Sequence, residues 1–274
     1  MTPLEQAEHS ITKKYRKQIW RPFLAGIHEY KLIDPGDRVA VCISGGKDSM
    51  LMAKCLQLLQ RYSDFPFELR YVVMDPGYAP VNRARIEENA AFLNLPIEVF
   101  DAPIFNYVAK LDKNPCYLCA RMRRGYLYRH AQEAGCNKIA LGHHFDDVVE
   151  TVLMSLFYNG EFRTMMPKLS STNWQGMQLI RPMYRVKEAD ILAWRRHNDL
   201  SFIQCACRLT ENCALGDEGM GSKRHEIKAL IKKLSQTNPD MAAHIFRSIH
   251  DVNLDTIIGW HGGEGGAPGV EEAE

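Results

Sequence analysis

The chain has 274 residues, of which 46% are hydrophobic and 24% charged, and its net charge is +1. These values are typical of a globular protein with one large domain or two small ones. The balanced charge excludes an overall field for nucleic acid, so any RNA contact must come from local patches. No apolar run approaches a membrane span, and residues 1–10 lack a signal-peptide core. We therefore expect a cytoplasmic protein that does not bind membranes.

Residues 1–30 are expected to form an N-terminal basic helix, with the helical pattern clearest from residue 10 onward. Its basic side chains are Lys13, Lys14, Arg16, Lys17 and Arg21. They form either a solvated helix face or a contact with the phosphate backbone of RNA.

The most informative stretch is Ser44-Gly45-Gly46-Lys47-Asp48-Ser49. It follows a buried strand at 39–43 and precedes a helix that begins near Ser49. Adjacent glycines allow a sharp turn and a close backbone approach to a ligand. Backbone N–H groups at a helix N-terminus favour an anion, most plausibly phosphate. A Walker A loop is excluded, because it needs four residues between its glycines.

The chain then alternates between strands (69–74 and 96–100) and a helix (82–93), which predicts a doubly wound parallel α/β sheet. Asp75 follows the first of these strands, at the edge where such sheets bind ligands. It is therefore either a nucleotide contact or a turn-forming Asp before Pro76.

A second group of functional residues lies between residues 114 and 151. Cys116 and Cys119 open a helix that carries several arginines, and a strand at 138–141 ends at Gly142. In the helix that follows, which runs to about residue 158, Glu150 shares a face with Asp146 and with Asp147.

Beyond this helix we expect a loop at 159–176, a short strand at 177–180, a helix at 188–198 and a flexible loop at 212–221. A basic helix capped by Ser222 and a helix at 239–249 follow. The tail, 261–274, is rich in Gly and Glu and is expected to be disordered. The expected domains are thus a nucleotide domain at 31–210 and C-terminal helices at 211–260.

Four of the eight cysteines fall into two groups, Cys116 with Cys119 and Cys205 with Cys207. Four thiolates would make a closed zinc site, whereas three thiolates on a cubane cluster would leave one iron without a protein ligand. A redox pair is a further alternative. Spacing alone leaves these open. The strand and helix cysteines Cys42, Cys55 and Cys136 are assigned to the core.

Five segments together resemble the tRNA 2-thiocytidine synthetase family of iron–sulfur-dependent PP-loop ATP pyrophosphatases. They are residues 44–49, 116–125, 140–151, 166–169 and 180–182. The resemblance covers roughly residues 10–250. It implies an adenine nucleotide α-hydrolase-like PP-loop fold with helical N- and C-terminal additions. It also implies a [4Fe-4S] cluster, ATP, Mg²⁺ and a tRNA substrate.

The resemblance assigns the cluster ligands to Cys116, Cys119 and Cys205, with Cys207 as the alternative third ligand. The nucleotide would bind to the loop residues, and catalytic roles would fall to Lys47 and Asp48 together with the three cysteines. The nucleotide-binding set is Ser44, Gly45, Gly46, Lys47, Asp48, Ser49, Asp75, Gly142 and Asp147. The RNA-binding set is Arg121, Arg123 and Arg124.

The implied reaction is ATP-dependent 2-thiolation of a tRNA cytidine, with position 32 the expected site. It would use an adenylated base and sulfide bound to the cluster, since a carbonyl oxygen is a poor leaving group. Asp48 would orient either Mg²⁺ or Lys47, and Asp147 is a second metal candidate. A cysteine desulfurase or free sulfide would donate sulfur. The sequence does not decide between a monomer and a homodimer.

Other interpretations of the sequence are a related PP-loop enzyme acting on another substrate, including desulfuration of thiolated bases, and a zinc-stabilised RNA-binding module without catalysis. Intact Lys47, Asp48 and Ser49 argue against the second. An amide-forming PP-loop ligase would leave the paired cysteines unexplained.

Overall fold

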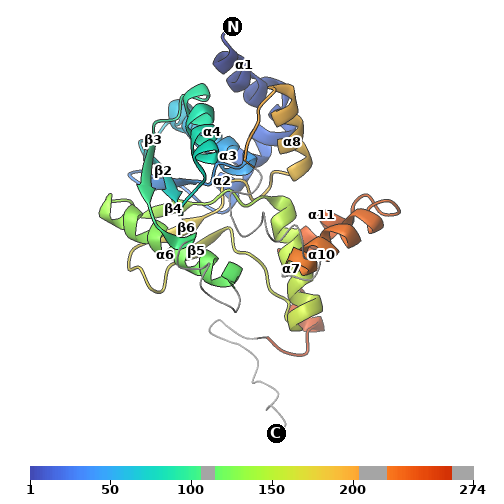
Figure 1. Ribbon diagram of the computed structural model, residues 1–274. Coiled ribbons are helices and arrows are strands. Elements are labelled where there is room, and N and C mark those ends of the chain that lie inside the picture. Colours follow the sequence, from blue (N-terminus) through green and yellow to red (C-terminus); the bar gives the residue numbers. More distant parts are fainter. Residues whose placement is uncertain (106–114, 204–220, 261–274) are drawn as a thin grey trace.

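The computed structural model describes residues 1–105, 115–203 and 221–260. A six-stranded sheet in the order β3-β2-β1-β4-β6-β5 forms its centre (Figure 1). The strands are β1 (Arg38–Ile43), β2 (Glu68–Asp75), β3 (Ile97–Asp101), β4 (Lys138–Ala140), β5 (Lys168–Ser170) and β6 (Gln178–Ile180). All pairs are parallel except β5 with β6. The predicted doubly wound α/β sheet is confirmed.

Helices follow the strands in the predicted order, and the first four alternate with β1 to β4. They are α3 (Lys47–Tyr62), α4 (Pro80–Phe92), α6 (Pro115–Glu133), α7 (Phe145–Asn159), α8 (Glu188–His197), α10 (Gly221–Leu234) and α11 (Met241–Ser248). A 3-10 turn, Leu254–Thr256, follows α11.

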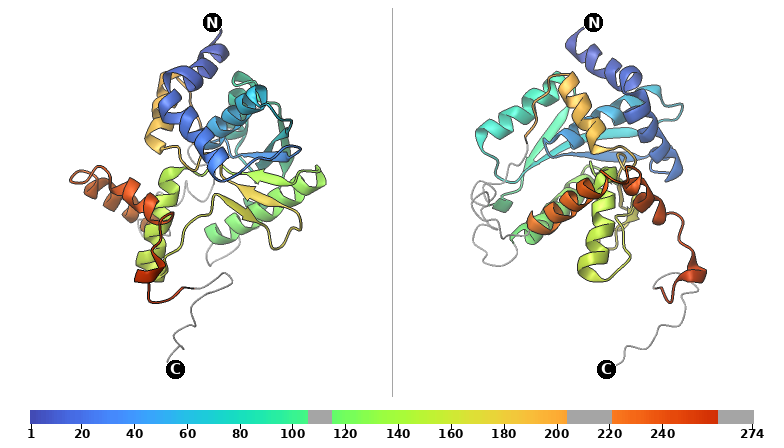
Figure 2. Two further views of the ribbon diagram at one scale, coloured as in Figure 1. Left: turned by 180° about the vertical axis from the view of Figure 1, so that it is seen from behind. Right: turned by 90° about the vertical axis from the view of Figure 1, so that its right-hand side faces the viewer.

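Alternate residues of β1 face opposite sides of the sheet. Val39 and Val41 belong to the larger core with α3, α4, α8 and the N-terminal helices. Ala40 and Cys42 belong to the smaller core with α6. Figures 1 and 2 show α6 on the opposite side of the sheet from α3 and α4. Because both faces are covered, β1 is apolar throughout, which is why its buried position could be predicted.

The N-terminal segment is not the single helix that the sequence predicts. It consists of α1 (Pro3–His9), two π-helical stretches (Ser10–Lys14 and Arg16–Trp20) and α2 (Arg21–Glu29). Glu8 of α1 forms ion pairs with the fully buried Lys54, at 2.5 Å, and with Arg61, at 2.8 Å. Burial raises the pKa of Glu8, but both cations outweigh it and leave the pKa below its usual value. These pairs tie the N-terminal segment to the outer face of α3.

Helices α7, α10 and α11 form a separate layer beside the sheet (Figures 1 and 2). Phe145 of α7 stacks on Phe246 of α11 with 4.6 Å between ring centroids, and Tyr184 packs against the same ring. This small core holds the N-terminus of α7 next to the carboxyl ends of the strands. Within the described part of the chain, no helix is long and apolar enough to cross a membrane.

The predicted loop at 159–176 is partly wrong, because it contains β5. This three-residue edge strand pairs antiparallel with β6. Its residues are half-buried or exposed, so they carry no apolar pattern. Backbone pairing with β6, and not burial, stabilises the strand, and the sequence has no signal for that.

Candidate active site

The Gly-rich stretch forms the predicted strand–turn–helix. Gly45 has a φ of +83°, a conformation that favours glycine, and Gly46 is the N-cap of α3. Ser49 pins the turn, because its hydroxyl accepts a hydrogen bond from the Ser44 N–H at 3.1 Å and donates to the Gly46 carbonyl at 3.0 Å. The buried Ser49 thus holds the loop around the start of the helix.

A cavity of about 290 Å³ opens beside this loop, at the carboxyl ends of β1, β2 and β4. Its lining includes Ile43, Ser44, Asp48, Ser49, Met74, Tyr78, Arg123, Gly142, His143 and Asp147. This is the edge at which doubly wound sheets bind ligands. A nucleotide phosphate in this cavity would meet the backbone N–H groups at the N-terminus of α3.

Gly142 lets β4 approach the loop closely. A Cβ atom on Gly142 would lie 3.0 Å from both Cα and N of Ser49, which are backbone atoms that cannot rotate away. The predicted place of Gly142 beside the nucleotide loop therefore has a steric reason.

The side chain of Lys47 does not line this cavity. Its Nζ lies 3.1 Å from a carboxylate oxygen of Asp48 and 2.9 Å from one of Glu188, at the start of α8. Burial lowers the pKa of Lys47, but the two carboxylates outweigh it and hold the pKa above its usual value. Burial likewise raises the pKa of Glu188, but Lys47 and Lys228 lower it to about 2. Lys47 is therefore a cation held ready beside the loop.

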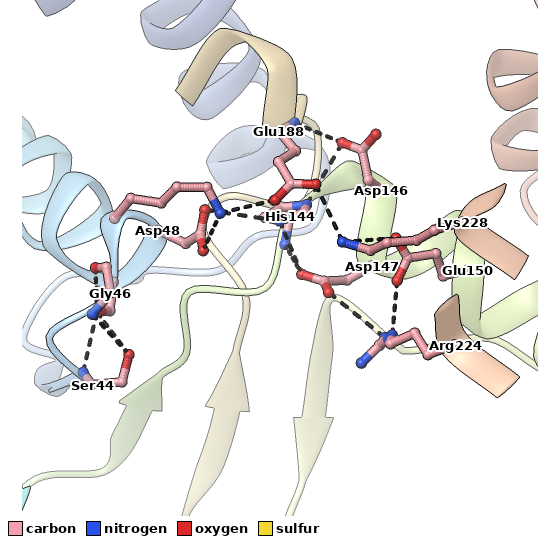
Figure 3. A network of polar contacts seen from close by, with 12 residues as sticks. Ser44, Gly46, Asp48, His144, Asp146, Asp147, Glu150, Glu188, Arg224 and Lys228 are labelled. Carbon is pink, nitrogen blue, oxygen red and sulfur yellow. Dashed lines mark hydrogen bonds and ion pairs between the residues drawn. The ribbon is translucent and has the colours of Figure 1, made fainter. Parts of the chain in front are cut away.

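His144 lies among carboxylates at the N-terminus of α7 (Figure 3). Its ring nitrogens are 3.8 Å from Asp48, 3.6 Å from Asp146 and 3.5 Å from Asp147. Oδ1 of Asp48 is buried and has no hydrogen-bond partner in the described structure. Unsatisfied carboxylate oxygen beside a phosphate site is the ligand type that Mg²⁺ prefers. Asp48 and Asp147, which both line the cavity, therefore fit the expected metal.

Two cations of α10 complete the polar network. Arg224 lies 2.7 Å from the buried Glu150 and 3.6 Å from Asp147, while Lys228 lies 3.5 Å from Glu150 and 3.4 Å from Glu188. Burial raises the pKa of Glu150 despite both cations. The sequence predicted that Asp147 and Glu150 share a helix face, but it did not assign Arg224 and Lys228 to the site. Their spacing of four places both on one helix face, but it does not show which carboxylates that face meets.

Of the two expected roles of Asp75, a nucleotide contact or a turn-forming residue, the structure shows the second. One oxygen accepts hydrogen bonds from the N–H groups of Gly77 and Tyr78, at 2.8 and 2.7 Å, and the other pairs with Arg83 at 2.9 Å. It holds the turn that places Tyr78 in the cavity wall.

The three predicted RNA-binding arginines do not form one patch. Arg123 lines the nucleotide cavity, and its guanidinium lies 5.6 Å from the ring centroid of Phe105. Arg121 and Arg124 line a different cavity, between α6 and the hairpin of β5 and β6. Contact with RNA through these residues stays a prediction.

Of the predicted cluster ligands, Cys119 has a described side chain. It packs against the small apolar cluster of Met74, Ala102 and Ile104, and it is near enough to Tyr78 to contribute to the raised pKa of that phenol, of which burial is the main cause. Because Tyr78 lines the nucleotide cavity, Cys119 lies in the neighbourhood of that cavity. Cys116 occupies the second position of α6, but its side chain is outside what the structure describes.

Cys205 and Cys207 lie in the segment that the structure does not describe. Among the described residues, no group of three or more His, Cys, Asp or Glu side chains is placed to hold a metal ion. The predicted core cysteines are confirmed, since Cys42, Cys55 and Cys136 are all buried. Burial raises the pKa of Cys42 to about 12.

Comparison with known proteins assigns the family. The PP-loop domain family matches residues 16–207. A tRNA-cytidine(32) 2-sulfurtransferase of Coxiella burnetii is 32% identical over 249 residues, 90% of this chain and 94% of the relative. One from Bordetella pertussis is 33% identical over 258 residues, 92% and 77% of the two chains. The chain belongs to the tRNA-cytidine(32) 2-sulfurtransferase family of PP-loop proteins.

A solved structure supports the fold of this PP-loop family member. The U34-tRNA thiolase NcsA from Methanococcus maripaludis, solved with its [4Fe-4S] cluster, superposes with a TM-score of 0.66. Identity is 21%, and the match covers 93% of this chain and 84% of that one. The resemblance predicted from the five sequence segments is therefore confirmed at the level of family and fold.

Proposed function

We propose that this protein transfers sulfur to C2 of a tRNA cytidine, at position 32, in an ATP-dependent reaction. The observation that carries the proposal is the cavity beside Ser44 and Ser49, whose lining includes Asp147 in the acidic first turn of α7 and also Tyr78, which is close to Cys119. The relatives named tRNA-cytidine(32) 2-sulfurtransferase match nearly the whole chain and support this substrate.

The loop residues would hold ATP so that the O2 oxygen of cytidine attacks the α phosphate. That attack forms the O2-adenylate and releases pyrophosphate, so AMP becomes the later leaving group. Ser44, Gly45, Gly46 and Ser49 would bind the pyrophosphate, the glycines through backbone N–H groups, and Lys47 would offset the charge that develops in the transition state. Lys47 must first leave Glu188, which lies 2.9 Å away.

Mg²⁺ would bind to Asp48 and Asp147, where it would neutralise phosphate charge. The backbone N–H of His144 donates to the Asp147 carboxylate at 3.0 Å and would orient this carboxylate as a metal ligand.

The second cofactor would be a [4Fe-4S] cluster on Cys116, Cys119 and Cys205, with Cys207 as the alternative third ligand. A cluster with three protein ligands keeps one iron open for sulfide and supplies a Lewis acid next to the activated base. The place of Cys119 near Tyr78, which lines the cavity, is consistent with this role.

The remaining partners are also proposals. A cysteine desulfurase or free sulfide would supply the sulfur, and the enzyme would meet its tRNA in the cytoplasm, as a monomer or a homodimer.

Nucleoside analysis of tRNA provides the test. We expect 2-thiocytidine to be missing from tRNA of a strain that lacks this protein, and to return with the wild-type gene but not with Lys47→Ala. Unchanged 2-thiocytidine in the deletion strain would overturn the proposal. Protein purified without oxygen should contain iron and absorb visible light, whereas stoichiometric zinc without iron would exclude the cluster and leave the non-catalytic alternative.

A further inference from the structure

A second cavity, of about 500 Å³, lies between α6 and the edge hairpin of β5 and β6. It shares no lining residue with the nucleotide cavity. Its walls include Arg121, Arg124 and Tyr128 of α6, Ser171 and Trp174 of the hairpin turn, and Arg181 after β6. Nothing in the reaction proposed above uses this space.

Three guanidinium groups line this cavity. Among the described residues, no carboxylate lies within 4 Å of Arg121, Arg124 or Arg181. Burial lowers the pKa of Arg181 to about 10, and the positive charge of Arg124 acts in the same direction. Like charges around a hollow repel one another until an anion enters, and guanidinium groups match the geometry of phosphate oxygens.

One wall of the same cavity is aromatic. Tyr128 and Trp174 stack with 6.0 Å between ring centroids and an interplanar angle of 6°. The backbone N–H of Trp174 donates to the hydroxyl of Ser171 at 3.1 Å, which fixes the turn that carries the indole. Trp174 is half-buried, so part of its surface remains accessible. Aromatic surface beside phosphate-binding cations is the combination with which proteins bind single-stranded nucleic acid.

Arg181 connects the two cavities. Its Nε donates to Nδ1 of His143 at 3.3 Å, and His143 lines the nucleotide cavity. It also donates to the backbone carbonyl of Met166 in the segment that leads into β5. An RNA strand whose target base reaches ATP in the nucleotide cavity would therefore have its neighbouring nucleotide close to Arg181.

Resting on the function proposed above, we propose that this second cavity binds a nucleotide of the RNA substrate next to the one that is modified. Its phosphodiester would contact Arg121, Arg124 and Arg181, and its base would pack against Trp174. The cavity would thus hold the RNA strand while the target base, turned out of its stack, reaches the α phosphate of ATP at the mouth of the nucleotide cavity.

Binding of an anticodon stem-loop RNA, measured by fluorescence anisotropy over a series of salt concentrations, tests the proposal. We expect Arg121→Ala and Arg124→Ala each to weaken binding and to reduce the salt slope by about one. Trp174→Ala should weaken binding about tenfold without changing the slope. Arg129→Ala is the matched control, because Arg129 is an exposed arginine on the same helix that does not line the cavity. ATP affinity should stay unchanged in all four variants, which also shows that they are folded.

The outcomes separate this proposal from the function on which it rests. The proposal for the second cavity would be overturned, and the proposed function would stand, if the Arg121, Arg124 and Trp174 variants kept ATP-dependent thiolation and bound RNA with the affinity and salt slope of the wild type. Failure of the wild-type protein to bind any tRNA would instead overturn the proposed function. If inorganic phosphate quenches the fluorescence of Trp174 in an Arg124-dependent way and RNA does not, the cavity binds a free anion and the proposal fails.

Discussion

Replacing Glu188 with Gln removes one of the two carboxylates that pair with Lys47 beside the nucleotide cavity. Glu188 accepts from Lys47 at 2.9 Å and lies 3.4 Å from Lys228. Its pKa of about 2, against 4.5 for a free glutamate, corresponds to about 3 kcal/mol of stabilisation at neutral pH. The side chain is 27% exposed, so water screens part of this energy. We expect Glu188→Gln to lower the free energy of unfolding by about 1–2 kcal/mol at pH 7.

The lowered pKa of Glu188 also determines how the stability difference between wild type and Glu188→Gln changes with pH. A carboxyl group with a lowered pKa stabilises the fold above the unfolded-state value of 4.5, and that stability is lost as the pH falls toward 2. The stability difference between wild type and Glu188→Gln should therefore be full at pH 6–7 and shrink as the pH falls below about 4.5.

Urea unfolding followed by circular dichroism at several pH values would measure this difference. Asp190→Asn is the matched control, because Asp190 lies on the same helix and its pKa is raised by burial. That variant should not be destabilised at pH 7. The ion-pair explanation would be refuted if Glu188→Gln were as stable as wild type at pH 7, or if its deficit did not shrink in acid.

Three further predictions concern the loop, the buried carboxylate and the cluster. Gly142→Ala should weaken ATP binding in calorimetry by at least about tenfold, because its Cβ would push against the backbone of Ser49 at 3.0 Å; Gly125→Ala, with open space around its Cβ, should not. Arg224→Ala should destabilise the protein by about 1–3 kcal/mol at pH 7, because the 2%-exposed Glu150 loses its 2.7 Å partner. Since the pKa of Glu150 is already raised, this deficit should be larger at pH 7 than at pH 4.5, and a flat dependence would contradict it. Cys119→Ser purified without oxygen should lose iron, whereas Cys136→Ser, altered in the core, should keep it; equal iron in both would exclude Cys119 as a ligand.

The sequence alone was sufficient for the parallel strands of the sheet and for the Gly-rich loop. Residues 39–43 form a continuous apolar run because β1 is covered on both faces. The residues from Ser44 to Ser49 act through local backbone geometry, so their pattern can be recognised in the sequence alone. The family resemblance rested on such local segments, and the relatives confirmed it.

The tertiary structure decided which distant side chains meet. Glu188, Arg224 and Lys228 joined the site because α8 and α10 pack beside α7, and Arg123 was separated from Arg124 because successive residues of α6 face different cavities. Ion pairs between distant helices depend on packing geometry, for which no local residue pattern exists. The same holds for β5, which exists through pairing with β6 and not through its own sequence.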